Sequence, residues 1–131
     1  MASEVLHTTA ASVFVDDHGL LYVVANGIQS TAETVRETFA AARSLLTAPA
    51  PALFDARNWP RAGAGFWVTF IDLLPGTVSA GAILVETAGR ADLGGFPEAV
   101  NRLMVPFEVF TDEAEAKAFL TQFLPTDDES D

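Results

Sequence analysis

Residues Ala52–Leu74 read ALFDARNWPRAGAGFWVTFIDLL, and this stretch decides the fold class. Its start, Ala52–Asp55, is apolar up to the aspartate, which predicts a short strand covered on both faces of a sheet. A turn through Trp59 and Pro60 follows, and we expect an apolar helix over about 65–74. This succession is typical of open α/β domains, in which sites usually lie in the loop after the carboxyl end of a strand.

Upstream of this stretch the sequence predicts a hairpin and a helix. Runs rich in β-branched and aromatic residues at 12–16 and 20–25 predict two strands joined by a tight turn. Ser30 and Glu33 have the spacing of a capping box, so we expect a helix to begin at Ser30 and to end before the Ala/Pro segment 48–51. The expected buried face of this helix has residues at helical spacing: Val35, Phe39, Ala42, Leu45 and Leu46.

Downstream, strands and helices continue to alternate. Pro75 and Gly76 are expected to end the second helix, and Val78–Glu86 to form a near-continuous apolar strand. A short helix is predicted near 97–104. A strand is expected at Phe107–Phe110, at the sheet edge, followed by a last helix capped by Thr111. The expected inner face of the last helix comprises Ala116, Phe119, Leu120 and Phe123. The predicted order is β-β-α-β-α-β-α-β-α, an α/β domain with a mixed, mostly parallel sheet.

The composition narrows the class of protein and its partners. The 131 residues suffice for one domain with a single core, and they include no cysteine, which excludes disulfides and thiol chemistry. With 18 acidic and 7 basic residues the net charge is −11, so phosphate backbones and anionic membranes would repel the chain. We therefore expect neither a nucleic-acid nor a membrane partner.

The ends of the chain are expected to lie outside the folded unit. The start lacks the basic and long apolar segments of a secretory signal, and the default expectation is a cytoplasmic protein. We expect a flexible N-terminal arm at 1–11, one domain at 12–125 and a disordered acidic tail at 126–131.

Two segments resemble a known family. The strand with its aspartate, Leu53-Phe-Asp-Ala-Arg57, and the closing Phe107-Glu-Val-Phe-Thr-Asp-Glu-Ala-Glu-Ala116 are similar to STAS/SpoIIAA-like domains, in particular to small uncharacterised bacterial STAS/SEC14-like proteins. The resemblance covers nearly the whole chain and implies a single STAS-like domain that acts by protein–protein interaction. STAS antagonists carry a phosphorylatable Ser or Thr at the start of the helix after this strand. Here that position reads Arg61-Ala-Gly-Ala-Gly65, and the nearest hydroxyl is Thr69, so a phospho-switch is not expected.

The candidate site combines this loop with one face of the following helix. The predicted partner-binding residues are Asp55, Arg57, Trp59, Arg61, Trp67 and Ile71. They would contact another protein or a second copy of the chain, as in a homodimer. Two alternatives remain open. Asp55 could brace its own turn through Arg57 or Arg61, and the helix could be buried on both sides.

The sequence predicts no catalysis, metal or cofactor. His7 and His18 lie in the expected arm and at a turn, with neither metal-ligand spacing nor the geometry of a catalytic triad. The second hypothesis is a binding domain for a small apolar or amphipathic ligand, because the ten phenylalanines could line a cavity. A pocket between the sheet and the 65–74 helix would favour this hypothesis. An enzyme comes third.

Overall fold

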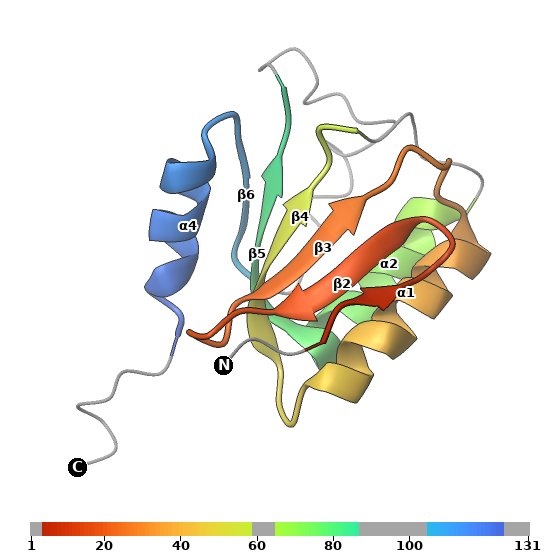
Figure 1. Cartoon of the computed structure of the whole chain (residues 1–131), viewed down its shortest axis with the longest axis horizontal. Helices are drawn as coiled ribbons and strands as arrows, with labels where there is room; N and C mark the ends of the chain where they lie inside the picture. The colour runs from red at the N-terminus through yellow and green to blue at the C-terminus, as the bar shows by residue number, and fades with distance from the viewer. Residues whose placement is uncertain (1–3, 59–64, 87–104, 125–131) are drawn as a thin grey trace.

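A six-stranded sheet forms the centre of the computed structural model, which describes residues 4–58, 65–86 and 105–124 (Figure 1). Neighbouring strands in the sheet are also consecutive in the chain. The first two pairs are antiparallel, and the last three pairs are parallel. The strands are β1 (Leu6–His7), β2 (Ala11–Val15), β3 (Leu21–Ala25), β4 (Ala50–Asp55), β5 (Val78–Leu84) and β6 (Phe107–Phe110). The predicted α/β class with a mostly parallel sheet is confirmed.

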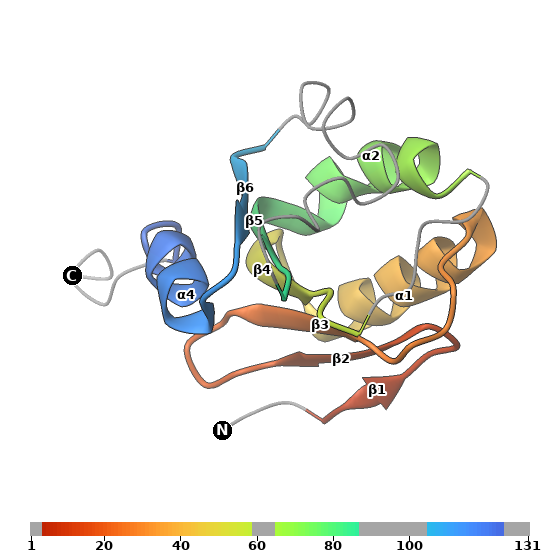
Figure 2. The same ribbon diagram turned by 90° about the horizontal axis from the view of Figure 1, so that it is seen from above.

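Helices cover both faces of the sheet. Helices α1 (Ala32–Leu45) and α2 (Phe66–Thr77) lie side by side on one face, and α4 (Glu113–Thr121) lies on the other (Figure 2). Because side chains alternate along a strand, each strand contributes to two apolar clusters. In β4, Phe54 belongs to the cluster under α1 and α2, whereas Leu53 packs with Ala116 and Leu120 of α4.

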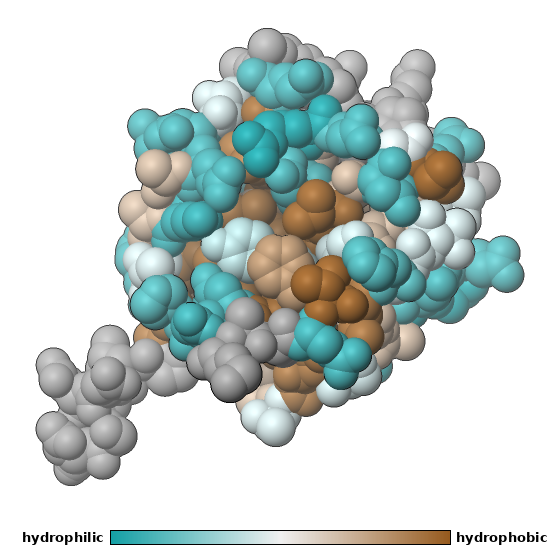
Figure 3. Space-filling view, in the orientation of Figure 1, coloured by the Kyte–Doolittle hydropathy of each residue, from teal (hydrophilic) through white to brown (hydrophobic). Residues whose placement is uncertain are grey.

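The cluster under α1 and α2 is the larger one. Val35, Phe39 and Ala42 of α1 are buried in it, as their spacing predicts, and Leu45 and Leu46 are partly buried against it. The opposite face is covered less completely, because α4 packs mainly on β4, β5 and β6. Figure 3 shows apolar surface in the middle of that face, bordered by hydrophilic residues.

Several predicted boundaries are corrected by the structure. Leu6 and His7, expected in a flexible arm, form β1 and pair with β2, and His7 Nδ1 lies 2.9 Å from Ser12 Oγ. Strand β4 begins at Ala50, and β5 ends at Leu84. The helix predicted at 97–104 and the acidic tail at 126–131 lie outside the described residues.

The helix ends also differ from the prediction. Thr31 caps α1 instead of Ser30, with a reciprocal capping box to Thr34. Asp112 occupies the N-cap of α4 instead of Thr111. Pro75, predicted to end the second helix, lies inside α2, which ends at Thr77. A proline is tolerated in this last turn because it removes only one backbone hydrogen bond there.

No helix of the described segments is long and apolar enough to span a bilayer.

Candidate functional site

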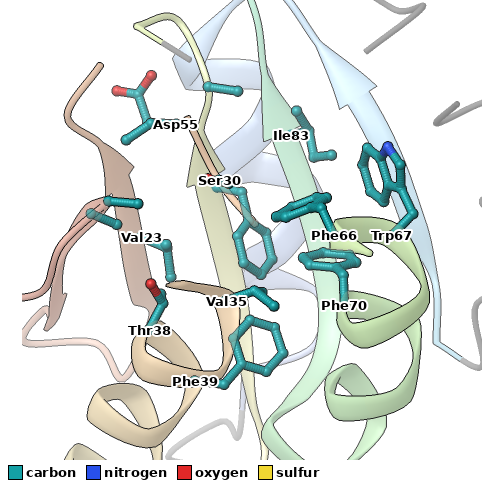
Figure 4. Close-up of a pocket in the computed structure, with 15 residues that line it drawn as sticks. Val23, Ser30, Val35, Thr38, Phe39, Asp55, Phe66, Trp67, Phe70 and Ile83 are labelled. Atoms are coloured by element: carbon teal, nitrogen blue, oxygen red, sulfur yellow. The ribbon is translucent and has the colours of Figure 1, made fainter. Parts of the chain in front are cut away.

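An apolar pocket lies between the sheet and the pair α1 and α2 (Figure 4). It sits where the parallel strands β3 and β4 end and where α1 and α2 begin, the end of an α/β sheet at which ligands usually bind. Its volume is about 70 Å³. An engineered cavity of about 150 Å³ holds a benzene ring. The pocket therefore has room for a small apolar group and not for a whole lipid.

Aromatic side chains from three elements form much of the pocket wall. The rings that line it are Phe39, Phe54, Phe66, Trp67 and Phe70. Phe70 lies at the centre of this wall, with its ring centroid 5.3 Å from those of Phe54 and Trp67 and 5.7 Å from that of Phe39. Edge-to-face contacts at these separations are favourable, so the rings hold one another in position.

The space itself depends on small residues at the ends of strands. Ala10 and Ala11 at the start of β2, Ala25 at the end of β3, and Ala56 after β4 all line the pocket. A larger side chain at any of these positions would extend into the space that these alanines leave. These four residues could not be predicted as pocket residues from the sequence. Their effect depends on three separate segments that come together where the strands β2, β3 and β4 begin or end.

The polar groups of the pocket are engaged within the protein. The Thr38 hydroxyl is buried, donates to the backbone oxygen of Thr34 at 2.9 Å and lies 3.2 Å from the Thr8 hydroxyl. Among the described residues, no buried side-chain nitrogen or oxygen lacks a hydrogen-bond partner. A strongly polar ligand would find no buried group waiting for it.

Asp55 is at the pocket rim, and Arg57 holds its carboxylate. Arg57 Nε donates to Oδ1 at 2.9 Å, and Nη2 donates to Oδ2 at 2.7 Å, while the backbone N–H of Arg57 donates to Oδ1 at 3.1 Å. Figure 4 shows the carboxylate pointing away from the aromatic rings. The alternative that Asp55 braces its own turn is therefore what the structure shows.

The pKa of Asp55 reflects two opposed effects. Partial burial acts to raise the pKa, but the hydrogen bonds from the Arg57 side chain and backbone and the guanidinium charge outweigh burial. The pKa of Asp55 lies below its ordinary value as a result. The carboxylate is therefore ionised at neutral pH.

Arg57 also links this turn to α4. Its Nη2 lies 3.4 Å from Glu113 Oε1, and Glu113 Oε2 lies 3.1 Å from Lys117 Nζ. Lys117 Nζ in turn lies 5.5 Å from the centroid of the Tyr22 ring. A side-chain hydrogen bond with Tyr22, followed by one with Glu113, raises the pKa of Lys117. The charged network therefore runs from Asp55, at the rim of the apolar pocket, to α4 on the other side of the sheet.

The other predicted site residues do not form one cluster. Trp67 is half-buried, packs against Phe66 at 4.8 Å between ring centroids and lines the pocket. Ile71 lies in a groove lined by residues of α1 and α2. Trp59 and Arg61 lie outside the described residues. Of the six predicted residues, Asp55 and Trp67 both line the pocket, on opposite sides of it in Figure 4, and Arg57 is joined to it through Asp55.

Within residues 4–58, 65–86 and 105–124, no three His, Asp or Glu side chains form a group that could hold a metal ion.

Comparison with known proteins identifies the fold. No protein-family model matches the chain. No curated protein matches it either. Among solved structures, the chain is similar to an uncharacterised protein of the DUF3478 family with a SpoIIAA-like fold from Shewanella loihica PV-4. The TM-score is 0.59 at 20% sequence identity, over 90% of this chain and 98% of that chain. The predicted STAS/SpoIIAA-like architecture is thereby confirmed, and the chain is an α/β protein with a SpoIIAA-like fold.

Proposed function

We propose that this protein binds a small, uncharged apolar group in the pocket between its sheet and the helices α1 and α2. The observation that carries the proposal is the pocket, with a wall of aromatic rings and alanines at the ends of the strands. If the sheet and the helices only packed against each other, their side chains would fill this space. The space left between them supports ligand binding instead.

The chemistry of the lining sets the class of ligand. Among the described residues that line the pocket, Asp55 is the one with a charge, and Arg57 neutralises its carboxylate. Apolar walls with few polar groups are typical of sites for small hydrophobic molecules. At about 70 Å³ the pocket would accept a branched alkyl end, with the rest of the ligand outside.

A titration with 3-methyl-1-butanol, followed by NMR, tests the proposal. The methyl resonances of Val23, Val35 and Ile83 should shift together, because these side chains line the pocket. A ligand of this size is expected to bind in about the millimolar range. Shifts spread over the surface, or absent at these methyl groups, would refute the proposal.

A matched pair of variants sharpens the experiment. Ala25→Leu places a larger side chain in the pocket and should abolish the shifts, since Ala25 lines the pocket and packs against its cluster. Ala118→Leu makes the same chemical change on the exposed face of α4 and should leave binding unchanged. Native mass spectrometry of freshly purified protein would show whether a ligand is already carried.

A non-enzymatic protein-interaction role at the Asp55–Arg61 loop is the second candidate. Its support is the Arg57 side chain, which is 46% exposed and so can be reached by a partner. Because both oxygens of Asp55 already accept from Arg57, a partner would have to compete for this pair. If Asp55→Ala and Trp67→Ala both left every association unchanged in pull-down experiments, this candidate would fail.

A further inference from the structure

We propose that the outer face of α2 joins two copies of this chain about a two-fold axis. The proposal is independent of the ligand pocket, which lies on the inner side of the same helix.

The first observation is an apolar strip that α2 presents on its outer side. Val68 is 65% exposed, the largest value among the exposed large hydrophobic residues of the described segments. Ile71 follows three residues later and is partly exposed. At this spacing the two side chains lie on one helical face. The inner face of α2 is occupied by Phe66, Phe70 and Leu74, which are buried. Val68 is therefore not part of the core. Exposed apolar surface such as the strip of Val68 and Ile71 is found at protein–protein interfaces.

The second observation is a pair of opposite charges beside this strip. Arg36 of α1 and Asp72 of α2 line the same groove as Val68 and Ile71. Both residues are exposed. Within the described part of the chain, the salt bridges that involve arginine or aspartate side chains do not include Arg36 or Asp72. Each of the two charges is thus free to pair with a group from another molecule.

One positive and one negative group on the same patch make the patch complementary to itself. In a two-fold interface residue i of one copy meets residue j of the other, and the reverse contact occurs as well. Arg36 of each copy would then meet Asp72 of the second copy, with the Val68 and Ile71 strips packed between the two ion pairs. The two-fold axis thus makes the one contact between Arg36 and Asp72 twice.

The charge of the whole chain disfavours association of two copies, so the contact itself must supply the attraction. At a net charge of −11, two copies repel one another unless the contact itself pairs opposite charges. The groove is a small surface, below the roughly 800 Å² per partner of a standard stable interface. We therefore expect a weak dimer whose population rises with concentration.

Sedimentation equilibrium of the full chain at about 0.1 M salt, from about 10 µM to about 1 mM, tests the proposal. At this ionic strength the repulsion between the two acidic copies is screened beyond about 10 Å, whereas the short-range ion pairs persist. Wild type should shift from monomer towards dimer over this range. Arg36→Asp and Asp72→Arg should each weaken the dimer by about ten-fold or more, because each places like charges opposite one another. The double variant R36D/D72R restores opposite charges in exchanged positions and should recover the dimer.

Controls separate this proposal from the ligand pocket and from simple loss of folding. Glu115→Arg reverses a charge on the exposed side of α4 and should leave dimerisation as in wild type. All variants should keep the circular dichroism spectrum and the cooperative thermal transition of wild type, which shows that they are folded whether or not the pocket binds a ligand. A chain that remains monomeric at the highest concentration would overturn the proposal. So would a dimer that neither reversal weakens, or a double variant that fails to recover it.

Discussion

Gly81, in the middle of β5, allows the Phe107 ring to lie directly against the sheet. A Cβ at this position would lie 2.5 Å from Cδ2 and 3.1 Å from Cζ of that ring. Because the ring packs against the apolar cluster under α1 and α2, it has no easy way to withdraw. We expect Gly81→Ala to lower the free energy of unfolding by about 1–3 kcal/mol, measured by urea denaturation.

Gly76 is the matched control for this prediction. A Cβ there would lie 2.9 Å from Arg43 Nη2, the tip of a side chain whose Nε donates to Thr77 Oγ1 at 2.8 Å. Only this tip has to shift, and no ring or backbone atom does. Gly76 lies in the last turn of α2, where alanine is the better helix former. Gly76→Ala should therefore leave the free energy of unfolding unchanged or slightly increase it. Equal losses in both variants would contradict the role given to Phe107.

The pair formed by Asp55 and Arg57 predicts a pH dependence of stability. Because the pKa of Asp55 is lowered on folding, its ionised form stabilises the fold at any pH above the ordinary value of about 4. This stabilisation is lost as the pH falls through the lowered pKa. Asp55→Asn should therefore lose less stability than wild type between neutral and strongly acidic pH, as measured by thermal unfolding across that range.

Arg57→Gln provides the partner arm of the same experiment. It removes the side-chain hydrogen bonds and the charge that lower the pKa of Asp55, while the backbone N–H of residue 57 still donates to Oδ1. It should therefore flatten the acid side of the curve in the same direction as Asp55→Asn, but less completely. The double variant should change the curve no further than Asp55→Asn alone, since the Arg57 side chain acts on the acid limb through Asp55. Additive changes would mean that the two residues act separately.

At the scale of an element, the N-caps of α1 and α4 should contribute different amounts to the free energy of unfolding. In α1 the Thr31 side chain accepts from the Thr34 N–H, and the Thr34 side chain accepts from the Thr31 N–H. In α4 the cap residue Asp112 makes no such side-chain bond. We expect Thr31→Ala to cost about 1 kcal/mol of unfolding free energy and Asp112→Ala only a few tenths. Chemical denaturation of both variants in parallel would decide; a larger loss for Asp112→Ala would contradict the assignment of the caps.

At the scale of the whole molecule, the single sheet depends on helices from both sides. Leu120 of α4 is fully buried and packs against Leu53 and Leu84 on the face opposite α1 and α2. We expect Leu120→Ala to lower the free energy of unfolding by about 2–4 kcal/mol. Phe123, predicted as part of the same inner face, is 36% exposed, so Phe123→Ala should cost clearly less. A single cooperative transition in both variants would show that α4 unfolds together with the rest of the sheet.

The sequence predicted those parts of the fold that have a strong local pattern. The apolar runs of β2 to β6 and the helical spacing of Val35, Phe39 and Ala42 were sufficient to place the main layers. The two-residue strand β1 has no periodicity to detect. The cap of α1 was placed one residue early because Ser30 and Thr31 both carry a hydroxyl group.

The sequence was sufficient to predict where the candidate site lies, but not that the site is an apolar pocket. Asp55 marked the correct end of the sheet, and the alternative of an ion pair with Arg57 is what forms. The pocket depends on Ala10, Ala25 and Ala56, which are distant in sequence and meet only when the strands are aligned. A small residue leaves space only where its neighbours do not fill it, and a linear pattern carries no information about those neighbours.

The order of the strands has a consequence for how the chain is made. Since each described strand pairs with the strands before and after it in the sequence, no strand has to insert between two that are already joined. Between the end of β3 at Ala25 and the start of β4 at Ala50 a ribosome spends about 1–5 s. A hairpin closes in about 1–10 µs. Strands β2 and β3 thus have ample time to pair outside the exit tunnel, and the growing sheet can offer each later strand an edge as that strand emerges.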